Sequence, residues 1–402
     1  MKFSKLSQLF LVSGIGLVLA SLLTACSLVT IDYVFVAASA GNTAGSAGQI
    51  YTYAVDAESG ALRSGAATVS SGGTTPVAMA VSGDYYNLYV ANAGNNSVVH
   101  FSIATNGALS QKESITLANT PVSLAVSPSN NYLYVVSGTA SATLTEYSLS
   151  SGAIGNAVVT LPLTLASYPT DTIVPTGVTV LANSNAVFVT AYDKSAYNPG
   201  GATTSNANPG WLFGYSIGSG GALNPVAASP YQAGIKPSAL AADPTSRFVF
   251  VTDFASNSLI GYGLQSNESL QFMVNGPFKT GNQPSSIAID PRGLYIYVSN
   301  SLDSSVSAYA ITLATGSPTA VVSATGVNNS TDTQPVSIVI DPSLGRFVYT
   351  ANYLGNSVSG FRLNPSTGSI TLLRATPYPT GAIPTAIVAV PHGNHATQTV
   401  TP

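Results

Sequence analysis

The sequence predicts an all-β protein, a seven-bladed β-propeller built from four-stranded antiparallel blades. Three observations carry this prediction. A proline followed by a short apolar strand recurs seven times, the next two strands of each block carry an aromatic residue at a fixed position, and turns rich in Gly, Asn and Ser separate the strands. Most blocks are about fifty residues long, a period typical of propellers, because one small sheet cannot bury both of its faces without neighbours.

The innermost strand of each blade, called strand a, is predicted to begin at the recurring proline. The residues that follow are mostly aliphatic, which indicates a buried strand entered by a rigid turn residue. In several blocks a turn headed by Asp or Ser comes next, as at Ser127, Asp243, Asp290 and Asp341, and we predict that these aspartates form type I turns rather than take part in chemistry. The seven prolines are Pro76, Pro121, Pro175, Pro237, Pro284, Pro335 and Pro384.

The second and third strands of each block, called b and c, carry the fixed aromatic residues. We predict that these rings pack one blade against the next and do not enclose a ligand. In strand b they are Phe35, Tyr89, Tyr134, Phe188, Phe250, Tyr297 and Tyr349, and in strand c they are Tyr53, Phe101, Tyr147, Tyr215, Tyr262, Tyr309 and Phe361.

The two ends of the chain are predicted to complete one composite blade. Residues 33–37, residues 50–55 and the stretch after Leu62 resemble strands b, c and d with no strand a before them, whereas Pro384 opens a strand a with nothing after it. Pairing the N-terminal strands b, c and d with the C-terminal strand a closes the ring and removes open sheet edges. The propeller is therefore expected to span 31–390, with a polar tail at 391–402.

Short segments within the blades resemble a known family of repeats. Tyr89-Val-Ala-Asn92, Tyr297-Val-Ser-Asn300 and Thr350-Ala-Asn352, with Asn-Ser and Gly-Ala-Leu punctuation downstream, are similar to the YVTN-type repeats of seven-bladed propellers related to 6-phosphogluconolactonase. The resemblance covers nearly all of the mature chain and implies the same fold. It implies less about activity, since such propellers include lactonases, a muconate-cyclising branch and proteins that only bind a partner.

The N-terminal residues predict export and a lipid anchor. Lys2 and Lys5 precede an apolar run, and Leu23-Thr-Ala-Cys26 resembles a bacterial lipobox, so residues 1–25 are read as a lipoprotein signal peptide. Cys26 is the only cysteine, which excludes an intramolecular disulfide and suits an acylation site. An ordinary secretory signal and an uncleaved anchor helix are the alternatives. With lipidated Cys26, residues 26–30 become a short linker and the protein is expected at the outer membrane or cell surface.

Composition restricts the class of partner. Charged residues make up only 7% of the chain, and after loss of Lys2 and Lys5 ten basic residues remain against fifteen acidic ones. No basic stripe is present to neutralise phosphates, so a nucleic-acid partner is not expected. We expect a monomer that meets the membrane through its anchor and presents the outward face to a small molecule, a glycan or a protein.

The outward face is expected to carry the b-to-c and d-to-a loops, because the chain enters at strand b and places the a-to-b turns toward the lipid. Four blades have an Asn or Asp three residues after the strand b aromatic, followed five residues later by a serine. This residue either closes the turn through its side chain or forms a polar ring at the channel mouth, and the ring would contain Asn92, Asp253, Asn300 and Asn352. A long loop, 192–210, adds Tyr192, Asp193 and Trp211 as candidate ligand contacts.

Two functions remain open. The first is a non-catalytic envelope lipoprotein that binds its ligand on the outward face, where the residues before the prolines include Lys236, Gln283 and Gln334. The second is an exported lactone hydrolase, in which Asp253 or a neighbouring carboxylate of the mouth acts as general base and Lys236 gives electrophilic help. No cofactor or metal is expected, since only three histidines occur and no metal-ligand spacing is present. A phosphorylated substrate would call for several basic residues in one pocket, but the arginines that follow the a-to-b turns lie on the other face.

Overall fold

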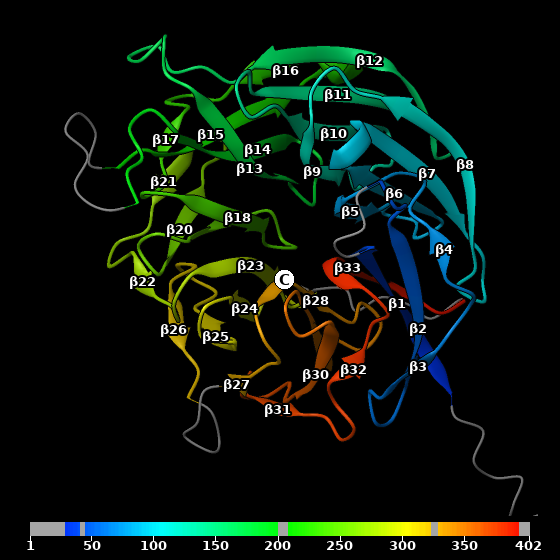
Figure 1. The fold of residues 1–402 in the computed structure, drawn as a ribbon. Coiled ribbons are helices and arrows are strands. Elements are labelled where there is room, and N and C mark those ends of the chain that lie inside the picture. Colours follow the sequence, from blue (N-terminus) through cyan, green and yellow to red (C-terminus); the bar gives the residue numbers. More distant parts are fainter. Residues whose placement is uncertain (1–28, 41–44, 200–207, 323–328, 394–402) are drawn as a thin grey trace, which may run out of the picture.

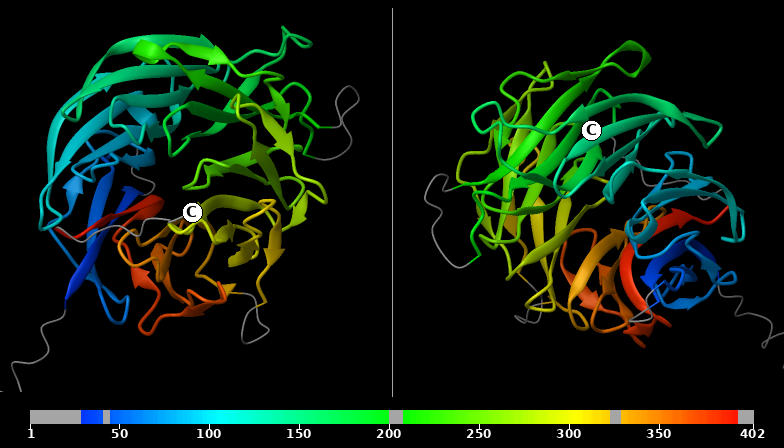
Figure 2. Two further views of the ribbon diagram at one scale, coloured as in Figure 1. Left: turned by 180° about the vertical axis from the view of Figure 1, so that it is seen from behind. Right: turned by 45° about the horizontal axis from the view of Figure 1, so that its top comes forward.

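The computed structural model describes residues 29–40, 45–199, 208–322 and 329–393. Seven antiparallel sheets follow one another around a central axis, as Figures 1 and 2 show from three directions. The predicted fold class, a seven-bladed propeller with four-stranded blades, is confirmed. The predicted signal peptide and Cys26 lie outside the described residues. Within the described ranges no helix is long and apolar enough to cross a membrane.

Strand a of every blade begins at the predicted proline or within two residues of it. Each of these strands contacts the strand a of the following blade, so that the innermost strands form a continuous ring. They are β5 (Pro76–Val81), β9 (Pro121–Val126), β13 (Ile173–Val180), β18 (Pro237–Ala242), β23 (Pro284–Ile289), β28 (Pro335–Ile340) and β33 (Ile383–Pro391).

Strands b and c form the middle of each sheet, and both are buried over most of their length. The b strands are β1 (Thr30–Ser39), β6 (Asn87–Asn92), β10 (Tyr132–Ser137), β14 (Ala186–Asp193), β19 (Phe248–Asp253), β24 (Tyr295–Asn300) and β29 (Phe347–Asn352). The c strands are β2 (Gln49–Asp56), β7 (Ser97–Ile103), β11 (Thr143–Ser150), β15 (Gly210–Ile217), β20 (Ser258–Leu264), β25 (Ser305–Ile311) and β30 (Ser357–Leu363).

The outermost strand, d, is continuous in two blades, as β8 (Leu109–Thr116) and β12 (Ala153–Pro162). In the other five it is split into two short pieces that pair with strand c separately. These pairs are β3 (Leu62–Ser64) with β4 (Val69–Ser70), β16 (Leu223–Pro225) with β17 (Tyr231–Gln232), β21 (Leu270–Phe272) with β22 (Phe278–Lys279), β26 (Pro318–Ala320) with β27 (Asn329–Ser330), and β31 (Ile370–Leu372) with β32 (Tyr378–Pro379). Two short 3₁₀ turns, η1 (Ala93–Asn95) and η2 (Ser219–Gly221), complete the described elements.

The aromatic residues of strand b pack between blades, as predicted. All seven are fully buried. Three of the tyrosines also donate a hydrogen bond to a glycine carbonyl in the c-to-d turn of the next blade: Tyr89 to Gly152 over 2.6 Å, Tyr297 to Gly368 over 2.7 Å, and Tyr349 to Gly60 over 2.6 Å. Five of the strand c aromatics are also buried, whereas Tyr53 and Tyr147 are half-buried.

The predicted closure of the ring is confirmed. Strand β33 pairs antiparallel with β1, with Phe35 opposite Val388, and the composite sheet runs β3-β2-β1-β33. Beside this seam lies a buried acid, Asp32, which accepts a hydrogen bond from the Ser343 hydroxyl of the neighbouring blade. Burial and the nearby Asp341 carboxylate raise the pKa of Asp32 from 3.8 to about 8.

The aspartates of the a-to-b turns are turn residues, as predicted. Asp243 Oδ1 accepts the backbone N–H groups of Arg247 and Phe248, at 2.6 and 2.8 Å. Asp341 accepts four backbone N–H groups in the equivalent turn. These bonds use up the carboxylate oxygens, so the aspartates serve the start of strand b.

Candidate ligand site at the outward mouth

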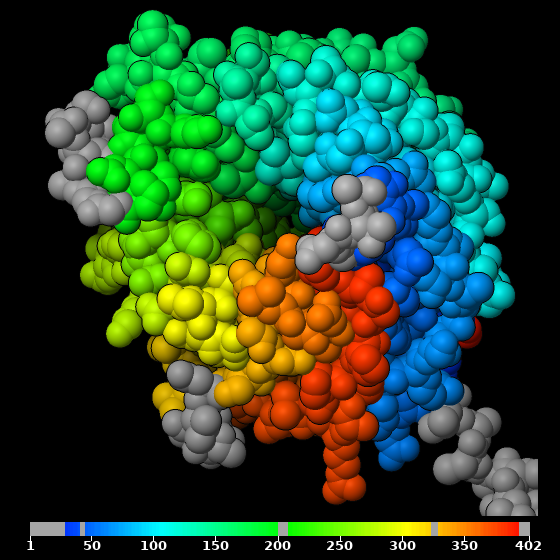
Figure 3. All heavy atoms as spheres, viewed as in Figure 1, coloured from blue at the N-terminus to red at the C-terminus, as the bar shows by residue number. Residues whose placement is uncertain are grey.

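The channel inside the ring has an uncharged wall. None of the seven a strands contains an acidic or basic residue. Their hydroxyl groups are used to join blades: Ser238 donates to the carbonyl of Pro284 over 2.6 Å, and Ser285 donates to that of Pro335 over 2.7 Å. A hollow at the middle of the ring is visible in Figure 3. Charged chemistry is therefore confined to the loops at its two ends.

One cation, Lys236, lies at the outward end, directly before β18. Its Nζ atom lies over three aromatic rings, at 5.4 Å from the centroid of Tyr192, 5.1 Å from Tyr197 and 5.0 Å from Phe254. All three distances fall within the range of cation–π attraction. Among the described residues the Lys236 ammonium makes no ion pair, so its charge is held by ring faces and remains available to an anionic or carbonyl ligand.

The aromatic residues around Lys236 come from two blades. Tyr192 ends β14, and the chain then turns at Asp193, whose Oδ1 accepts the N–H groups of Ser195 and Ala196. This turn brings Tyr197 back against Tyr192, with the ring centroids 5.5 Å apart in an edge-to-face arrangement. Phe254 follows β19 in the next blade. Tyr192, one of the predicted ligand contacts, thus lies beside Lys236, whereas Phe254 was not among the predicted residues.

Asp253, the predicted general base, is held by backbone donors. Its carboxylate accepts the N–H groups of Ile235, Lys236 and Ala255 and the hydroxyl of Ser256, over 2.6 to 3.1 Å. The side chain has no exposed surface. It follows that Asp253 fixes the chain before β18, and that it reaches no ligand while these bonds persist.

A glycine makes this arrangement of Asp253 possible. Gly234 has φ +77°, and a Cβ there would lie 2.1 Å from Asp253 Oδ2. Only glycine combines that backbone conformation with that closeness. The structure thus joins Lys236 and Asp253 through the Lys236 backbone, and it does not bring the ammonium and the carboxylate together as an acid–base pair.

The three asparagines proposed for a polar ring are also fully buried. Asn300 and Asn352 each donate from Nδ2 to the serine five residues later, over 3.1 Å. Asn92 instead exchanges hydrogen bonds with Ser71, in the connection that precedes its own blade. The turn-closing interpretation therefore describes Asn300 and Asn352, although their partner is a serine side chain rather than the backbone two residues on. Asn92 instead ties the end of its strand b to the preceding connection, and none of the three asparagines has exposed surface.

Among the described contacts of the Lys236 ammonium, neither Trp211 nor Asp193 takes part. Trp211, in β15, packs against the apolar cluster between the blade of β9–β12 and the blade of β13–β17. The Oδ2 atom of Asp193 is buried without a hydrogen-bond partner, and burial together with the Asp171 carboxyl raises its pKa above 3.8. Asp193 therefore supports the turn that positions Tyr197.

Gln283 and Gln334, the two residues with side-chain amides predicted at the mouth, have an unusual backbone conformation. Gln283 and Gln334 both have left-handed φ angles, 54° and 59°, directly before the strand a proline. Their carbonyls accept the N–H groups of Ser301 and Tyr353, which fastens each b-to-c loop to the same blade's first strand. Neither side chain has a hydrogen-bond partner within the described residues, and both are partly exposed. They stay candidate ligand contacts.

A second acid lies in a cavity on the same face. A hollow of about 590 Å³ lies between the blade of β18–β22 and the blade of β23–β27. It is lined by residues that include Lys279, Asn282, Asp303 and Ser307. Asp303 is exposed, and it accepts the backbone N–H of Asn282 over 2.6 Å and its Nδ2 over 2.8 Å. It is thus an accessible carboxylate at the outward face, unlike Asp253. No three His, Cys, Asp or Glu side chains of the described chain are grouped to hold a metal ion.

Fold and mouth together define a seven-bladed propeller whose outward face carries few charges and one cation held by aromatic rings. A family model described as "Lactonase, 7-bladed beta-propeller" matches residues 48–164 and 105–395, so the chain belongs to this family. This confirms the resemblance seen in the repeats. A search of curated proteins found no matching relative.

Solved structures of lactonase-type propellers resemble this one closely. A periplasmic gluconolactonase of Pseudomonas aeruginosa is 16% identical, with a TM-score of 0.73 and coverage of 90% of this chain and 99% of its own. A putative 6-phosphogluconolactonase of Bacteroides uniformis is 15% identical, with a TM-score of 0.72 and coverage of 90% and 100%. A putative 6-phosphogluconolactonase of Bacteroides fragilis is 16% identical, with a TM-score of 0.69 and coverage of 91% and 99%. At such identities these likenesses establish the fold alone.

Proposed function

We propose that this protein binds a small unphosphorylated lactone, or the hydroxy acid that opening of the lactone yields, at the outward mouth beside Lys236. The observation that carries the proposal is the Lys236 ammonium, held over three rings without a carboxylate partner among the described residues. A carbonyl or carboxylate oxygen of the ligand accepts a charge-assisted hydrogen bond from it. The side-chain amides of Gln283 and Gln334, which have no hydrogen-bond partners in the described chain, add donors and acceptors for ligand hydroxyls.

The charge distribution supports an unphosphorylated ligand. A phosphate group is usually held by several cationic donors in one pocket, whereas Lys236 is the one basic residue within the aromatic cluster. Arg247, Arg292 and Arg346 lie in the turns between strands a and b, on the opposite face. One cation suits a single carbonyl or carboxylate.

The test is calorimetric titration of gluconate and of a panel of sugar and aliphatic lactones. Loss of a charged hydrogen bond costs about 1.5–3 kcal/mol, so Lys236→Met should weaken binding about 10- to 100-fold. Lys194→Met is the matched control, because Lys194 is an exposed lysine of the neighbouring loop. Equal affinities of the Lys236→Met variant and the wild type would refute the site.

The second candidate function is hydrolysis of the bound lactone, which membership of the lactonase family favours. Opening a lactone needs a base to activate water and a donor to stabilise the oxyanion. Asp303 is the accessible carboxylate of the outward face and shares its cavity with Lys279. In this proposal Asp303 takes the proton of the attacking water, Lys279 of the same cavity stabilises the carbonyl oxygen, and the alkoxide leaves with that proton.

Base consumption at constant pH measures this hydrolysis directly. Turnover that is lost in Asp303→Asn and kept in a folded Asp253→Asn variant would assign the base to Asp303, and the reverse result would restore Asp253, the base first predicted. Binding without turnover of any lactone would leave a binding module. Activity and affinity are measured on the same samples, so the two candidates are separable.

We further propose that the protein is exported and lipid-anchored through Cys26. Its support is the lipobox-like sequence together with the periplasmic location stated for the Pseudomonas neighbour. Cys26→Ser should move the protein from the membrane fraction to the soluble fraction, and mass spectrometry of the wild type should find acyl groups on Cys26. An unmodified Cys26 in the mature protein would refute the anchor.

A further inference from the structure

One a-to-b turn differs from the others on the face opposite Lys236. Two residues before strand b begins, all six of these turns place a residue in the left-handed region. A small or turn-forming residue stands there in five of them: Asn130, Ser184, Ser246, Gly293 and Gly345. The turn between β5 and β6 has Tyr85, at φ +64°. A bulky side chain is unfavourable in this conformation, and strain of this kind points to a role other than folding.

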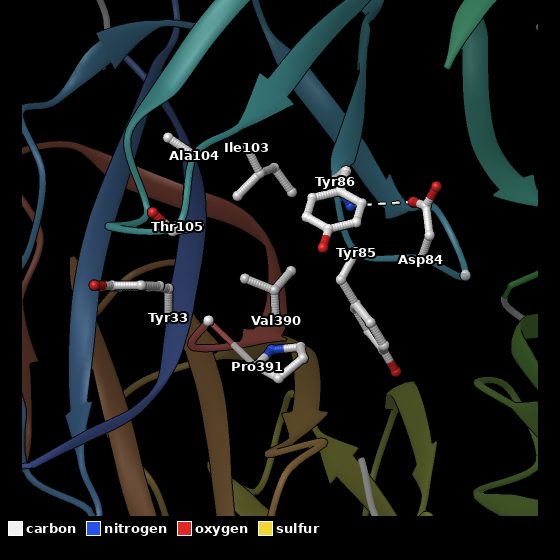
Figure 4. Close-up of a pocket in the computed structure, with 11 residues that line it drawn as sticks. Tyr33, Asp84, Tyr85, Tyr86, Ile103, Ala104, Thr105, Val390 and Pro391 are labelled. Atoms are coloured by element: carbon white, nitrogen blue, oxygen red, sulfur yellow. Dashed lines mark hydrogen bonds between the residues drawn. The ribbon is translucent and has the colours of Figure 1, made fainter. Parts of the chain in front are cut away.

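Tyr85 lies at the edge of a cavity of about 430 Å³. Ile103, Val390 and Pro391 line it with apolar surface, and Tyr86 contributes a second aromatic side chain that is 58% exposed. Figure 4 shows Tyr85 on one side of Val390 and Pro391 and Tyr33 on the other side, with the Tyr86 ring above Tyr85 and next to Asp84. Tyr86 thus gives the cavity an accessible ring face, while Tyr85 at its edge is half-buried and packs against the apolar cluster that contains Val390.

Several polar atoms of this cavity have no hydrogen-bond partner in the described chain. Asp84 Oδ1 accepts the Tyr86 N–H over 3.1 Å and the Ser82 hydroxyl, whereas Asp84 Oδ2 has no hydrogen-bond partner in the described chain. The hydroxyls of Tyr85 and Tyr86 also have none there. Ring faces beside a free carboxylate oxygen and free hydroxyls match a sugar, which has apolar C–H faces and a rim of hydroxyl groups.

We propose that this cavity binds a neutral saccharide, with the ring of Tyr86 against a sugar face and Asp84 Oδ2 accepting sugar hydroxyls. The site is separate from the Lys236 mouth, because it is built from the a-to-b turn and from the ends of β7 and β33. A lipid surface is the competing partner for exposed tyrosines. The concave shape and the Asp84 carboxylate favour the saccharide, since an anionic bilayer would repel that charge.

The test uses the full chain in detergent and saturation-transfer NMR with a panel of glucose, galactose, mannose and N-acetylglucosamine saccharides. Tyr86→Ala removes the ring, and Tyr85→Asn places at the strained position the residue that Asn130 supplies in the next blade. We expect both variants to lose the saccharide signal while remaining folded, which melting curves on the same samples verify. Phe272→Ala, an exposed aromatic of β21 that is 47% accessible, should keep the signal.

Three results would overturn the proposal. The first is no signal from any saccharide in the wild type, and the second is a signal that persists in both tyrosine variants. The third is binding to vesicles of phosphatidylethanolamine and phosphatidylglycerol that Tyr86→Ala abolishes while no saccharide binds, which would assign the tyrosines to a lipid surface. Because the melting temperature of each variant is measured on the same samples, loss of signal through unfolding is distinguishable from loss of the binding site.

Discussion

A buried glutamate between two blades should make the stability of this protein depend on pH. Glu146, in β11, has no exposed surface, and neither carboxyl oxygen has a hydrogen-bond partner in the described chain. It lies beside the Tyr134 ring, under the turn that contains Gly221, where an added Cβ would be 2.1 Å from Oε1. Burial in this site raises the pKa of Glu146 from 4.5 to about 7.

The sign and size of the effect follow from that pKa. Between pH 4.5 and 7 the folded protein keeps a proton on Glu146 that the unfolded chain has lost, so the free energy of unfolding falls as the pH rises. The decline is complete above the folded pKa of about 7. At about 1.36 kcal/mol per pH unit it amounts to about 3 kcal/mol. Glu146→Gln keeps the shape of the protonated carboxyl without this penalty.

Urea unfolding at pH 5 and pH 8, followed by circular dichroism, tests the reasoning. The variant should match the wild type at pH 5 to within about 1 kcal/mol and exceed it by about 3 kcal/mol at pH 8. Glu58→Gln, at an exposed glutamate, is the control and should shift neither value. A difference between wild type and Glu146→Gln that is the same at both pH values would contradict the raised pKa, because it would then come from packing alone.

Three further predictions concern the joints between blades. Tyr349→Phe leaves the buried Gly60 carbonyl without its 2.6 Å donor and should cost about 1 kcal/mol in urea unfolding; an unchanged midpoint would contradict this. The raised pKa of Asp32 predicts that the free energy of unfolding falls as the pH rises from about 4 to 8, a decline that Asp32→Asn should remove in the same titration. Deletion of 384–390 opens the edge of β1 and should yield unfolded or oligomeric protein in gel filtration, whereas a folded monomer would show that the closing strand is dispensable.

The sequence predicts most of this fold because each blade repeats the same demands. Strand a must be uncharged and begin sharply, hence the prolines, and strand b must fill the space between two sheets, hence the rings at Tyr89 and Tyr297. Such requirements appear as a period in the sequence and need no knowledge of contacts between blades. Closure by β33 also follows, since the incomplete sets of strands at the two ends of the chain complement each other.

The side-chain contacts at the mouth were harder to predict, because they depend on which hydrogen-bond donors the loops place beside each side chain. Asp253 stands near Lys236 in space as expected, but the backbone N–H groups of residues 235 and 236 already bind its carboxylate. The Lys236 ammonium meets rings instead, and Tyr197 reaches it only through the turn at Asp193. Loop conformation decides these contacts, and hydrophobic periodicity does not report loop conformation.

Comparison of equivalent positions in the seven blades also helps to distinguish residues that serve the fold from residues that serve function. Equivalent positions in different blades meet nearly the same backbone environment, so a residue that most blades share there serves the fold. A residue that only one blade has is not required by the shared backbone environment and needs another explanation. Lys236 is such a departure among the residues that precede strand a, and Tyr85 is another among the residues that precede strand b. Since they lie at opposite ends of the channel, each site should respond to its own ligand without regard to the other.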